Sequence, residues 1–372
     1  MKVPALEKYT VRHVLEYRGK PTLQYSVTEN DTIEDALALM SRYDIVSVPV
    51  FGSSSVSGSN NGAFVDILSV YDLRDYIVNS PGLDNEVEFQ LLSSHASGKP
   101  TILQTTVAQV VRSRKHASQE IDAQESLETL MRLFTVRGQH RVLVTGMPDA
   151  EDDALLSETA QQVPKSQRER GGSVDSGCSS LPSNNEHDDD DDGYGYHRPG
   201  QHVAASTING AICGLTQYDV LRFIQHHNHQ LGHHILDTTV TDIMKELPHQ
   251  HLFLKKITVR DSALHALKQL SAAHASALPV VDYDGKLITE VAGTSMRSLT
   301  TQMLGLLGKP VLAYMFGLRM PVDDPYIVHS NFNISQIMSG LLRMNCRRAW
   351  VVDSEERPLA VISLADVLNH FL

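Results

Sequence analysis

A helical pattern followed by a strand pattern occurs four times along the chain, always with the same spacing. Each helix has apolar residues at positions i, i+3, i+4 and i+7, the spacing of a helix with one buried face. The helices begin at Ile33, Leu127, Ala263 and Ile334, and the middle of the following strand lies sixteen residues later, at Pro49, Leu143, Pro279 and Trp350. Four unrelated helices would not keep this register, so the sequence predicts four repeats of one structural unit.

Other features accompany each of these helices in a constant order. The residue before each helix is a good N-cap: Thr32, Ser126, Ser262 and Asn333. A shorter helical pattern comes earlier in each repeat, starting at Val11, Val107, Val240 and Val311. After the central strand, a further strand leads into a closing helix. We therefore predict an α+β fold of four repeats, each a small sheet with flanking helices.

A hydroxyl residue and an aspartate three positions later stand where the last strand passes into the closing helix. The pairs are Ser69 and Asp72, Thr216 and Asp219, and Ser363 and Asp366. One carboxylate can accept hydrogen bonds from two neighbouring ribose hydroxyls, and bonds to a charged acceptor are roughly twice as strong as neutral ones. An aspartate in the first turn of a helix is also favoured by the helix dipole, so ligand contact and helix capping both remain open.

The third repeat departs from this pattern. It keeps the hydroxyl at Thr294, but Arg297 stands where the carboxylate is expected. Since a guanidinium cannot accept a hydrogen bond, we predict a degenerate site in this repeat.

The acidic charge of the chain is concentrated in one stretch. The formal net charge is −12, and the stretch between Met147 and Ala205 carries −9 of it, which leaves −3 for the remainder. This stretch is poor in aliphatic residues, so we predict a disordered acidic insert at about residues 147–205, within the second repeat. Because the remainder has no basic stripe, we expect no binding to nucleic acid.

The cysteines and the most apolar stretch indicate where the protein resides. The three cysteines lack metal-type spacing, and their odd number favours a reducing compartment over a disulfide framework. The most apolar stretch, residues 298–318, contains Lys309–Pro310 at its centre, so we expect no membrane span. We predict a cytoplasmic or nuclear protein.

Five histidines lie close together at His226, His227, His229, His233 and His234. Although His229 and His233 have the i, i+4 spacing of a zinc helix, no carboxylate follows in the pattern of a catalytic metal site. We expect a polar linker here, without a metal.

The repeated order of helices and strands, with Ser/Thr-x-x-Asp at the last junction, resembles the CBS domain, and four copies resemble two Bateman modules in tandem. The segments SALPVVDYDG (Ser276–Gly285), QHRVLV (Gln139–Val144) and LAVISLADVLNHF (Leu359–Phe371) are similar to the gamma subunit of the AMP-activated, SNF1-type protein kinase. The expected repeats span residues 1–80, 100–235, 236–305 and 306–372, and the two modules span 1–235 and 236–372.

This resemblance implies that AMP, ADP or ATP binds in clefts between repeats. Asp72, Asp219 and Asp366 would hold ribose hydroxyls, with Ser69, Thr216 and Ser363 near the phosphate. In gamma subunits a His-Arg pair before the central strand reaches the phosphates. His140–Arg141 matches that pair, and Arg347–Arg348 matches it in charge. The cations of repeats two and four would meet near the centre of the molecule.

The function implied is that of a non-catalytic regulatory subunit that senses adenine nucleotides and controls a SNF1-type kinase, with its catalytic and scaffold subunits as partners. No nucleophile, base and oxyanion donor are assembled in the sequence, so no enzymatic activity or cofactor is expected. One alternative is a CBS-only scaffold that regulates a phosphatase or another effector and has vestigial nucleotide sites. Another is a metal-dependent hydrolase that uses the histidine cluster. Calorimetry with nucleotides and elemental analysis for zinc distinguish the three.

Overall fold

The computed structural model describes residues 3–19, 25–52, 64–80, 101–114, 119–137, 139–146, 213–252, 254–319 and 324–372. All of these belong to one compact unit. The predicted acidic insert at about 147–205 lies outside the described residues.

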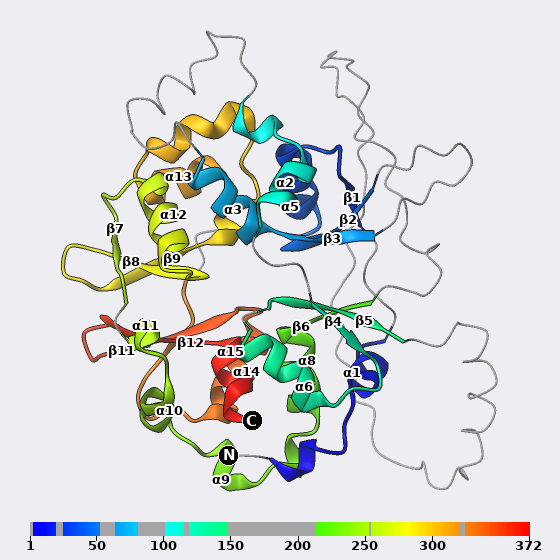
Figure 1. The fold of residues 1–372 in the computed structure, drawn as a ribbon. Helices are drawn as coiled ribbons and strands as arrows, with labels where there is room; N and C mark the ends of the chain where they lie inside the picture. Colours follow the sequence, from blue (N-terminus) through cyan, green and yellow to red (C-terminus); the bar gives the residue numbers. More distant parts are fainter. Residues whose placement is uncertain are drawn as a thin grey trace, which may run out of the picture. The chain divides into compact units, whose positions relative to one another are not determined.

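Four three-stranded sheets confirm the four predicted repeats and the α+β fold class (Figure 1). In every sheet a short first strand pairs parallel with the central strand, which pairs antiparallel with the third. In chain order, the strands are β1 (Val27–Thr28), β2 (Ser47–Phe51), β3 (Phe64–Ser69), β4 (Glu120–Asp122), β5 (Arg141–Thr145), β6 (Cys213–Thr216), β7 (Ile257–Thr258), β8 (Ala277–Val281), β9 (Leu287–Ala292), β10 (Ile327–Val328), β11 (Arg348–Val352) and β12 (Pro358–Ser363).

The helices of the sixteen-residue register begin at the predicted residues. They are α2 (Ile33–Arg42), α6 (Leu127–Thr135), α12 (Ala263–Ala272) and α14 (Ile334–Arg343). In each, the side chain of the predicted N-cap accepts a hydrogen bond from the backbone N–H three residues later, for example Thr32 from Asp35 at 3.1 Å. The cap supplies an acceptor for an N–H that has no partner within the helix, and this fixes where the helix starts.

The closing helices are α3 (Val70–Val78), α8 (Gln217–His226) and α15 (Leu364–His370). Repeat 3 has instead two 3-10 segments, Gly293–Met296 and Thr301–Gly308. This repeat is the one in which Arg297 replaces the aspartate, so both the acid and the regular α-helix are absent from the described residues of its junction.

The first helix of each repeat packs against the other repeat of its pair. These helices are α1 (Val11–Arg18), α5 (Val107–Ser113), α10 (Val240–Glu246) and α13 (Val311–Gly317). Two backbone hydrogen bonds hold α1 of repeat 1 against repeat 2. Val11 N–H donates to Glu125 O and Leu127 N–H donates to Tyr9 O, both at 2.9 Å, and we call this arrangement the exchange of first helices. Equivalent bonds join α5 to repeat 1, α10 to repeat 4 and α13 to repeat 3. A residue at the end of a first helix therefore reaches the junction of the partner repeat.

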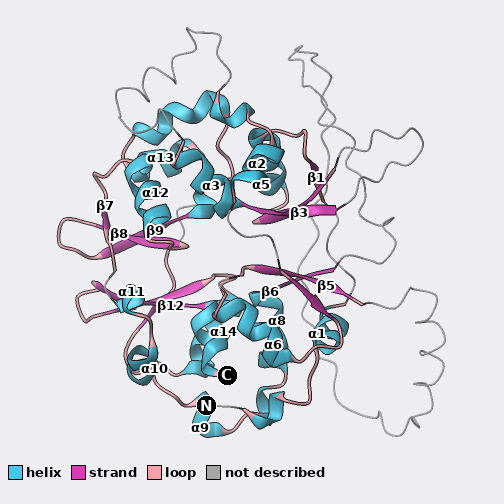
Figure 2. Ribbon diagram, in the orientation of Figure 1, coloured by secondary structure: helices cyan, strands magenta, loops and turns pink. Residues whose placement is uncertain are grey.

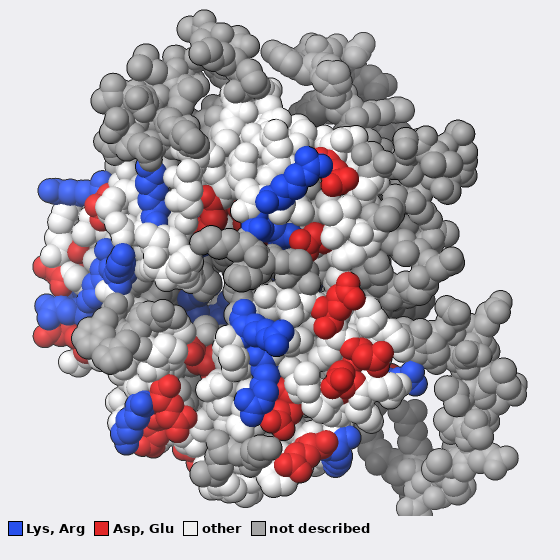
Figure 3. Space-filling view, viewed as in Figure 1, with Lys and Arg blue, Asp and Glu red and all other residues white. Residues whose placement is uncertain are grey.

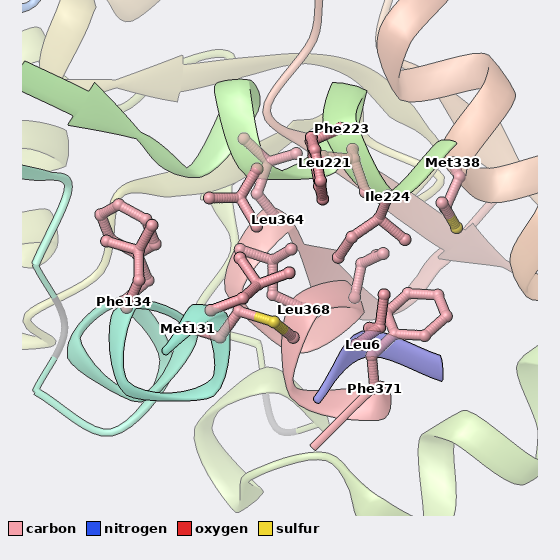
Figure 4. Close-up of a cluster of buried hydrophobic side chains, with 14 of the residues drawn as sticks. Leu6, Met131, Phe134, Leu221, Phe223, Ile224, Met338, Leu364, Leu368 and Phe371 are labelled. Atoms are coloured by element: carbon pink, nitrogen blue, oxygen red, sulfur yellow. The ribbon is translucent and has the colours of Figure 1, made fainter. Parts of the chain in front are cut away.

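Two helix-rich cores enclose the sheets (Figure 2). One core joins repeats 2 and 4 through α1, α6, α8, α10, α14 and α15, and Figure 4 shows Phe134, Leu221, Leu364 and Phe371 converging within it. The other joins repeats 1 and 3 through α2, α3, α5, α12 and α13. The sheets meet between these cores, where Trp350 and Val361 pack with Ala277, and Ile67 packs with Leu143.

The remaining described helical segments are short. They are the 3-10 turns Pro4–Leu6, Ile102–Gln104 and Asn228–Gln230 and the helices α9 (His233–Leu236) and α11 (His249–Leu252). Within the described ranges, no helix combines the length and apolar composition that crossing a bilayer requires.

Candidate functional site

A cavity of about 860 Å³ lies where all four repeats contribute side chains. Repeat 1 supplies Tyr71 and Arg74, repeat 2 supplies His140, repeat 3 supplies Lys255, and repeat 4 supplies Arg347, Arg348, Ser363 and Asp366. This volume is within the range of small-molecule sites, and such sites combine apolar walls with a few convergent polar groups. Apolar side chains from repeats 3 and 4 complete the wall, among them Ile243, Leu247, Leu254 and Val361.

Asp366 faces this cavity from the first turn of α15. Its Oδ2 atom accepts hydrogen bonds from the N–H and the hydroxyl of Ser363, at 2.7 and 2.6 Å. Nδ1 of His251 lies 3.1 Å from the same Oδ2. Asp366 therefore takes part in capping α15, as one of the two hypotheses predicts. The bonds of this cap use only one of its two carboxylate oxygens. The other oxygen remains available to accept bonds from a ligand.

Three buried polar atoms of cavity-lining residues have no hydrogen-bond partner in the described structure. They are Oη of Tyr71, Oγ1 of Thr135 and Nδ1 of His251; the His251 atom is near Asp366 but lacks hydrogen-bond geometry. A buried polar group without a partner costs about 1–3 kcal/mol, so such groups mark places where a ligand or water completes the structure. The three atoms therefore favour a polar ligand in this cavity.

The two arginines at the start of β11, Arg347 just before it and Arg348 as its first residue, have different environments. Arg348 is buried and donates to Glu290 and, at 3.3 Å, to Oγ of Ser276. Its neighbour Arg347 is partly exposed in the cavity, and no ion pair or side-chain hydrogen bond joins its guanidinium to another described residue. Arg347 is thus the guanidinium available to an anion, whereas Arg348 holds β9 and β11 together.

His140 stacks on Tyr71, with ring centroids 4.5 Å apart and an interplanar angle of 28°. Burial, together with the charges of Arg347, Arg348 and Arg74, lowers the pKa of His140 from 6.5 to about 4. The ring is therefore neutral at pH 7 and can donate one hydrogen bond. A bound anion would raise this pKa, since it would favour the protonated ring.

We expect His140 to make the protein sensitive to acid. Between pH 6.5 and about 4 the unfolded chain binds a proton at His140 that the folded protein does not, so stability is lost as the pH falls through this window. Between pH 7 and pH 5 the free energy of unfolding should therefore fall by about 1 kcal/mol less in His140→Gln than in the wild type. The difference is this small because water partly screens the ring. Urea unfolding at the two pH values measures the difference; equal losses in both proteins would contradict the expectation.

The cation pairs predicted from the sequence come together only in part. His140, Arg347 and Arg348 line the cavity, as expected, but Arg141 is not among the lining residues. Arg141 pairs with Thr216 across the β5–β6 ladder. Burial, with the nearby charges of Arg18 and Arg347, lowers the pKa of Arg141 to about 10 against the opposing charge of Asp219, so it remains a cation at pH 7.

The other predicted site residues lie at their expected junctions. Ser69 with Asp72 and Thr216 with Asp219 form the same capping arrangement as Ser363 with Asp366, with hydroxyl-to-carboxylate distances of 2.5 and 2.7 Å. In repeat 3, Arg297 forms an ion pair with Asp44 of repeat 1 at 2.6 Å, and Thr294 lies in a 3-10 turn. The ligand roles of these residues remain predictions.

Arg74 is a site residue that sequence reasoning missed. Its side chain is buried and binds Asp75 at 2.7 Å and the carbonyl of Ala275 at 2.8 Å. A signal was present, because Arg74 stands two residues after the motif aspartate, where the other closing helices have Leu221 and Leu368 in the core. An arginine on the apolar face of an amphipathic helix usually has a buried partner.

Within the described ranges, no group of three or more His, Cys, Asp or Glu side chains is placed to hold a metal ion. In the histidine cluster, His226 and His227 pack as rings against Tyr17 and Phe223. Their contacts are those of an aromatic cluster beside α1 and α8.

Comparison with known proteins finds a family match in two of the four repeats. Residues 21–79 and 319–372, in repeats 1 and 4, match the family model of the CBS domain. None of the curated proteins matches the chain. Protein MJ1225 from Methanocaldococcus jannaschii, proposed to be an archaeal homologue of g-AMPK, has a similar structure, with a TM-score of 0.58 at 13% identity over 98% of this chain and 100% of that chain. At this identity the similarity shows the fold alone.

Two further structures are less similar. An uncharacterised conserved protein from Pyrococcus horikoshii has a TM-score of 0.45 at 14% identity, covering 98% of this chain and 100% of that chain. CBSX2 in complex with AMP has a TM-score of 0.29 at 25% identity, covering 36% of this chain and 94% of that chain. These scores are too low to add to the assignment of the fold.

Proposed function

We propose that this CBS-domain protein, with its four CBS-like repeats, is a non-catalytic regulatory protein that binds an adenine nucleotide in the cavity at Asp366. The observation that carries the proposal is the placement of a carboxylate, an available guanidinium and a neutral histidine around one cavity that is walled by apolar side chains. A nucleotide needs three kinds of contact, and each is present. The base is apolar on its faces, the ribose donates hydrogen bonds, and the phosphate is an anion.

The ribose would lie against Asp366. Its two neighbouring hydroxyls can both donate to the carboxylate oxygen that the Ser363 cap leaves available. Because the acceptor is charged, these bonds are stronger than bonds between neutral groups. Val361 and Leu254 would pack against the base, which lies beside the ribose.

The phosphate would lie beside Arg347 and His140. Arg347 has no partner among the described side chains and can give a phosphate two parallel N–H bonds. His140 adds one N–H donor while it is neutral, and a bound anion would favour its protonated form. The carboxylates of Glu246 and Asp75 also line the cavity. The site therefore carries both positive and negative side chains and would not bind every anion.

Ligand binding would change the relative arrangement of the repeats, because side chains from all four repeats form the cavity wall. A ligand that contacts Asp366 of repeat 4, His140 of repeat 2 and Tyr71 of repeat 1 favours one arrangement of these repeats over others. A ligand can shift such an equilibrium only by its difference in affinity for the arrangements, and a bridging position provides that difference.

As the regulated partner we propose a SNF1-type kinase catalytic subunit with its scaffold subunit. The support is the similarity of the sequence to gamma subunits and the similarity of the fold to MJ1225, which is proposed to be related to g-AMPK. Affinity purification of the full chain followed by mass spectrometry tests this part. Recovery of a phosphatase in place of a kinase would favour the scaffold alternative.

Calorimetric titration of the full chain with AMP, ADP and ATP tests the nucleotide proposal. We expect saturable binding with dissociation constants well below 1 mM for at least one of the three. Absence of binding up to millimolar concentration would contradict the proposal, whatever partner is found.

Arg347→Gln should weaken the binding of AMP by about 10- to 100-fold, because it removes a charge-assisted contact to phosphate. Adenosine has no phosphate, so its affinity should not change. Arg343→Gln, at an exposed position on the preceding helix, is the matched control and should bind AMP like the wild type. A loss of adenosine affinity equal to the loss of AMP affinity would contradict the phosphate role of Arg347.

A further inference from the structure

One position at the end of each exchanged first helix faces the junction of the partner repeat. It lies eight residues after Thr10, Thr106, Thr239 and Pro310, the N-caps of α1, α5, α10 and α13. The residues at this position are Arg18, Arg114, Leu247 and Leu318. Two of the four are arginines, and both arginines contact a motif aspartate.

Arg114 occupies the junction of repeat 1. Its guanidinium donates to the carbonyl of Ile67 at 2.7 Å and to Oδ2 of Asp72 at 3.2 Å, and it also binds Asp66. The side chain of Arg114 is only 13% exposed, and that of Asp72 is 25% exposed. The guanidinium thus lies against the carboxylate expected to receive ribose hydroxyls, at the same Oδ2 atom that the helix cap uses, and takes the space beside it.

Arg18 repeats this geometry in the junction of repeat 2. Its guanidinium donates to the carbonyl of Gly214, which occupies the position of Ile67, and lies 3.5 Å from Oδ2 of Asp219. The two side chains are 11% and 15% exposed. Two arginines from different helices therefore make the same pair of contacts, to the strand carbonyl and to the motif aspartate.

Three junctions keep the aspartate. Among them, only the junction of repeat 4 has no arginine at this position. Leu247 is the C-cap of α10, with φ −66° and ψ 145°, and Arg114 is the C-cap of α5, with φ −74° and ψ 148°. The backbone therefore carries the two side chains in the same way. Leu247 cannot donate a hydrogen bond, and it lines the open cavity together with Asp366.

We propose that Arg18 and Arg114 act as internal ligands that close the clefts at Asp219 and Asp72, so that the chain binds a single adenine nucleotide, at Asp366. A tethered guanidinium competes at a high effective concentration, and a nucleotide would have to break the ion pair between the arginine and the motif aspartate to displace it. The residue at the end of the first helix then decides whether a cleft is open or closed. This inference rests on the proposed function.

Two variants should open the closed clefts. Arg18→Leu removes the guanidinium at Asp219. Arg114→Leu alone would leave the buried Asp66 without its arginine, so it is combined with Asp66→Ala; the pair reproduces Leu247 and Ala360 of repeat 4. Arg132→Leu is the control, because Arg132 is 50% exposed and pairs with Glu128 on the surface of α6.

Leu247→Arg is the converse variant. Its side chain should reach Asp366 in the manner in which Arg114 reaches Asp72, and AMP affinity should fall at least tenfold. Arg132→Leu, the surface control on α6, should bind AMP like the wild type. Folding of each variant is checked by circular dichroism and thermal unfolding.

Calorimetric stoichiometry with AMP decides between the outcomes. We expect one site per chain in the wild type and in Arg132→Leu, and two in Arg18→Leu and in Asp66→Ala/Arg114→Leu. More than one site in the wild type, or one site in both opened variants, would overturn the inference while leaving nucleotide binding intact. Binding by the opened variants but not by the wild type would support closure and reject the proposed site at Asp366. Binding by none would reject both.

Discussion

Asp366→Asn should weaken the binding of AMP by about 10- to 100-fold and the binding of adenosine by the same factor, because the ribose is common to both. The amide keeps an oxygen that can accept the backbone bond from Ser363, so the helix cap survives and the midpoint of thermal unfolding should change little. Calorimetry with the two ligands and a thermal scan measure the effects.

Asp242→Asn is a matched control for this substitution. Asp242 accepts from the hydroxyl of Thr239 at 2.8 Å at the start of α10, so it has the same cap, but its side chain is 53% exposed to solvent. We expect this variant to bind both ligands like the wild type. An Asp366→Asn protein that unfolds at a much lower temperature and binds AMP normally would show that Asp366 is a helix cap alone.

Arg348→Ala should lower the free energy of unfolding by about 3 kcal/mol, the lower end of the cost of removing one partner from a buried ion pair. Arg348 is 4% exposed, and its partner Glu290 also accepts a hydrogen bond from the indole N–H of Trp350 at 2.7 Å. Without the guanidinium, the carboxylate of Glu290 is left between two sheets with one neutral donor. Urea unfolding provides the measurement.

Two comparisons show whether the cost comes from the ion pair. Arg347→Ala, one residue earlier, should change the stability by less than about 0.5 kcal/mol, as is usual for a partly exposed side chain without such contacts. Arg348→Met combined with Glu290→Gln should recover much of the loss, because both charges are removed together and the amide oxygen can still accept from Trp350. Equal destabilisation by Arg347→Ala and Arg348→Ala would contradict the division of roles between the two arginines.

Local patterns in the sequence predicted the four repeats, and they did so for physical reasons. The caps Thr32, Ser126, Ser262 and Asn333 fix the first residue of each helix through bonds to residues three positions away, which depend on nothing distant. Likewise, Ser363 and Asp366 form a junction within four residues. Interactions between residues three or four positions apart can be predicted from the sequence without a structure.

The contacts that close or complete the site are not local. Arg114 meets Asp72 only because α5 crosses to repeat 1, and Arg18 meets Asp219 because α1 crosses to repeat 2. The exchange depends on backbone bonds between segments far apart in sequence, which no periodicity encodes. Nor could the sequence separate Arg347 from Arg348, since their difference comes from the burial of one beside Glu290.

Charged side chains lie both on the surface of the protein (Figure 3) and inside the cavity. On the face shown in Figure 3, acidic and basic side chains are interspersed among uncharged ones. The cation that matters for the proposal, Arg347, lies in the cavity, where it is only partly exposed. Charges buried in this way interact more strongly with a ligand than surface charges, because less water screens them.

A crystal structure of the full chain grown with saturating AMP tests the proposed site most directly. We expect the ribose hydroxyls within hydrogen-bond distance of Asp366 and the phosphate beside Arg347 and His140, with Arg18 and Arg114 still bound to Asp219 and Asp72. AMP bound elsewhere while the cavity at Asp366 stays empty, or bound there with its ribose turned away from the carboxylate, would contradict the proposed site.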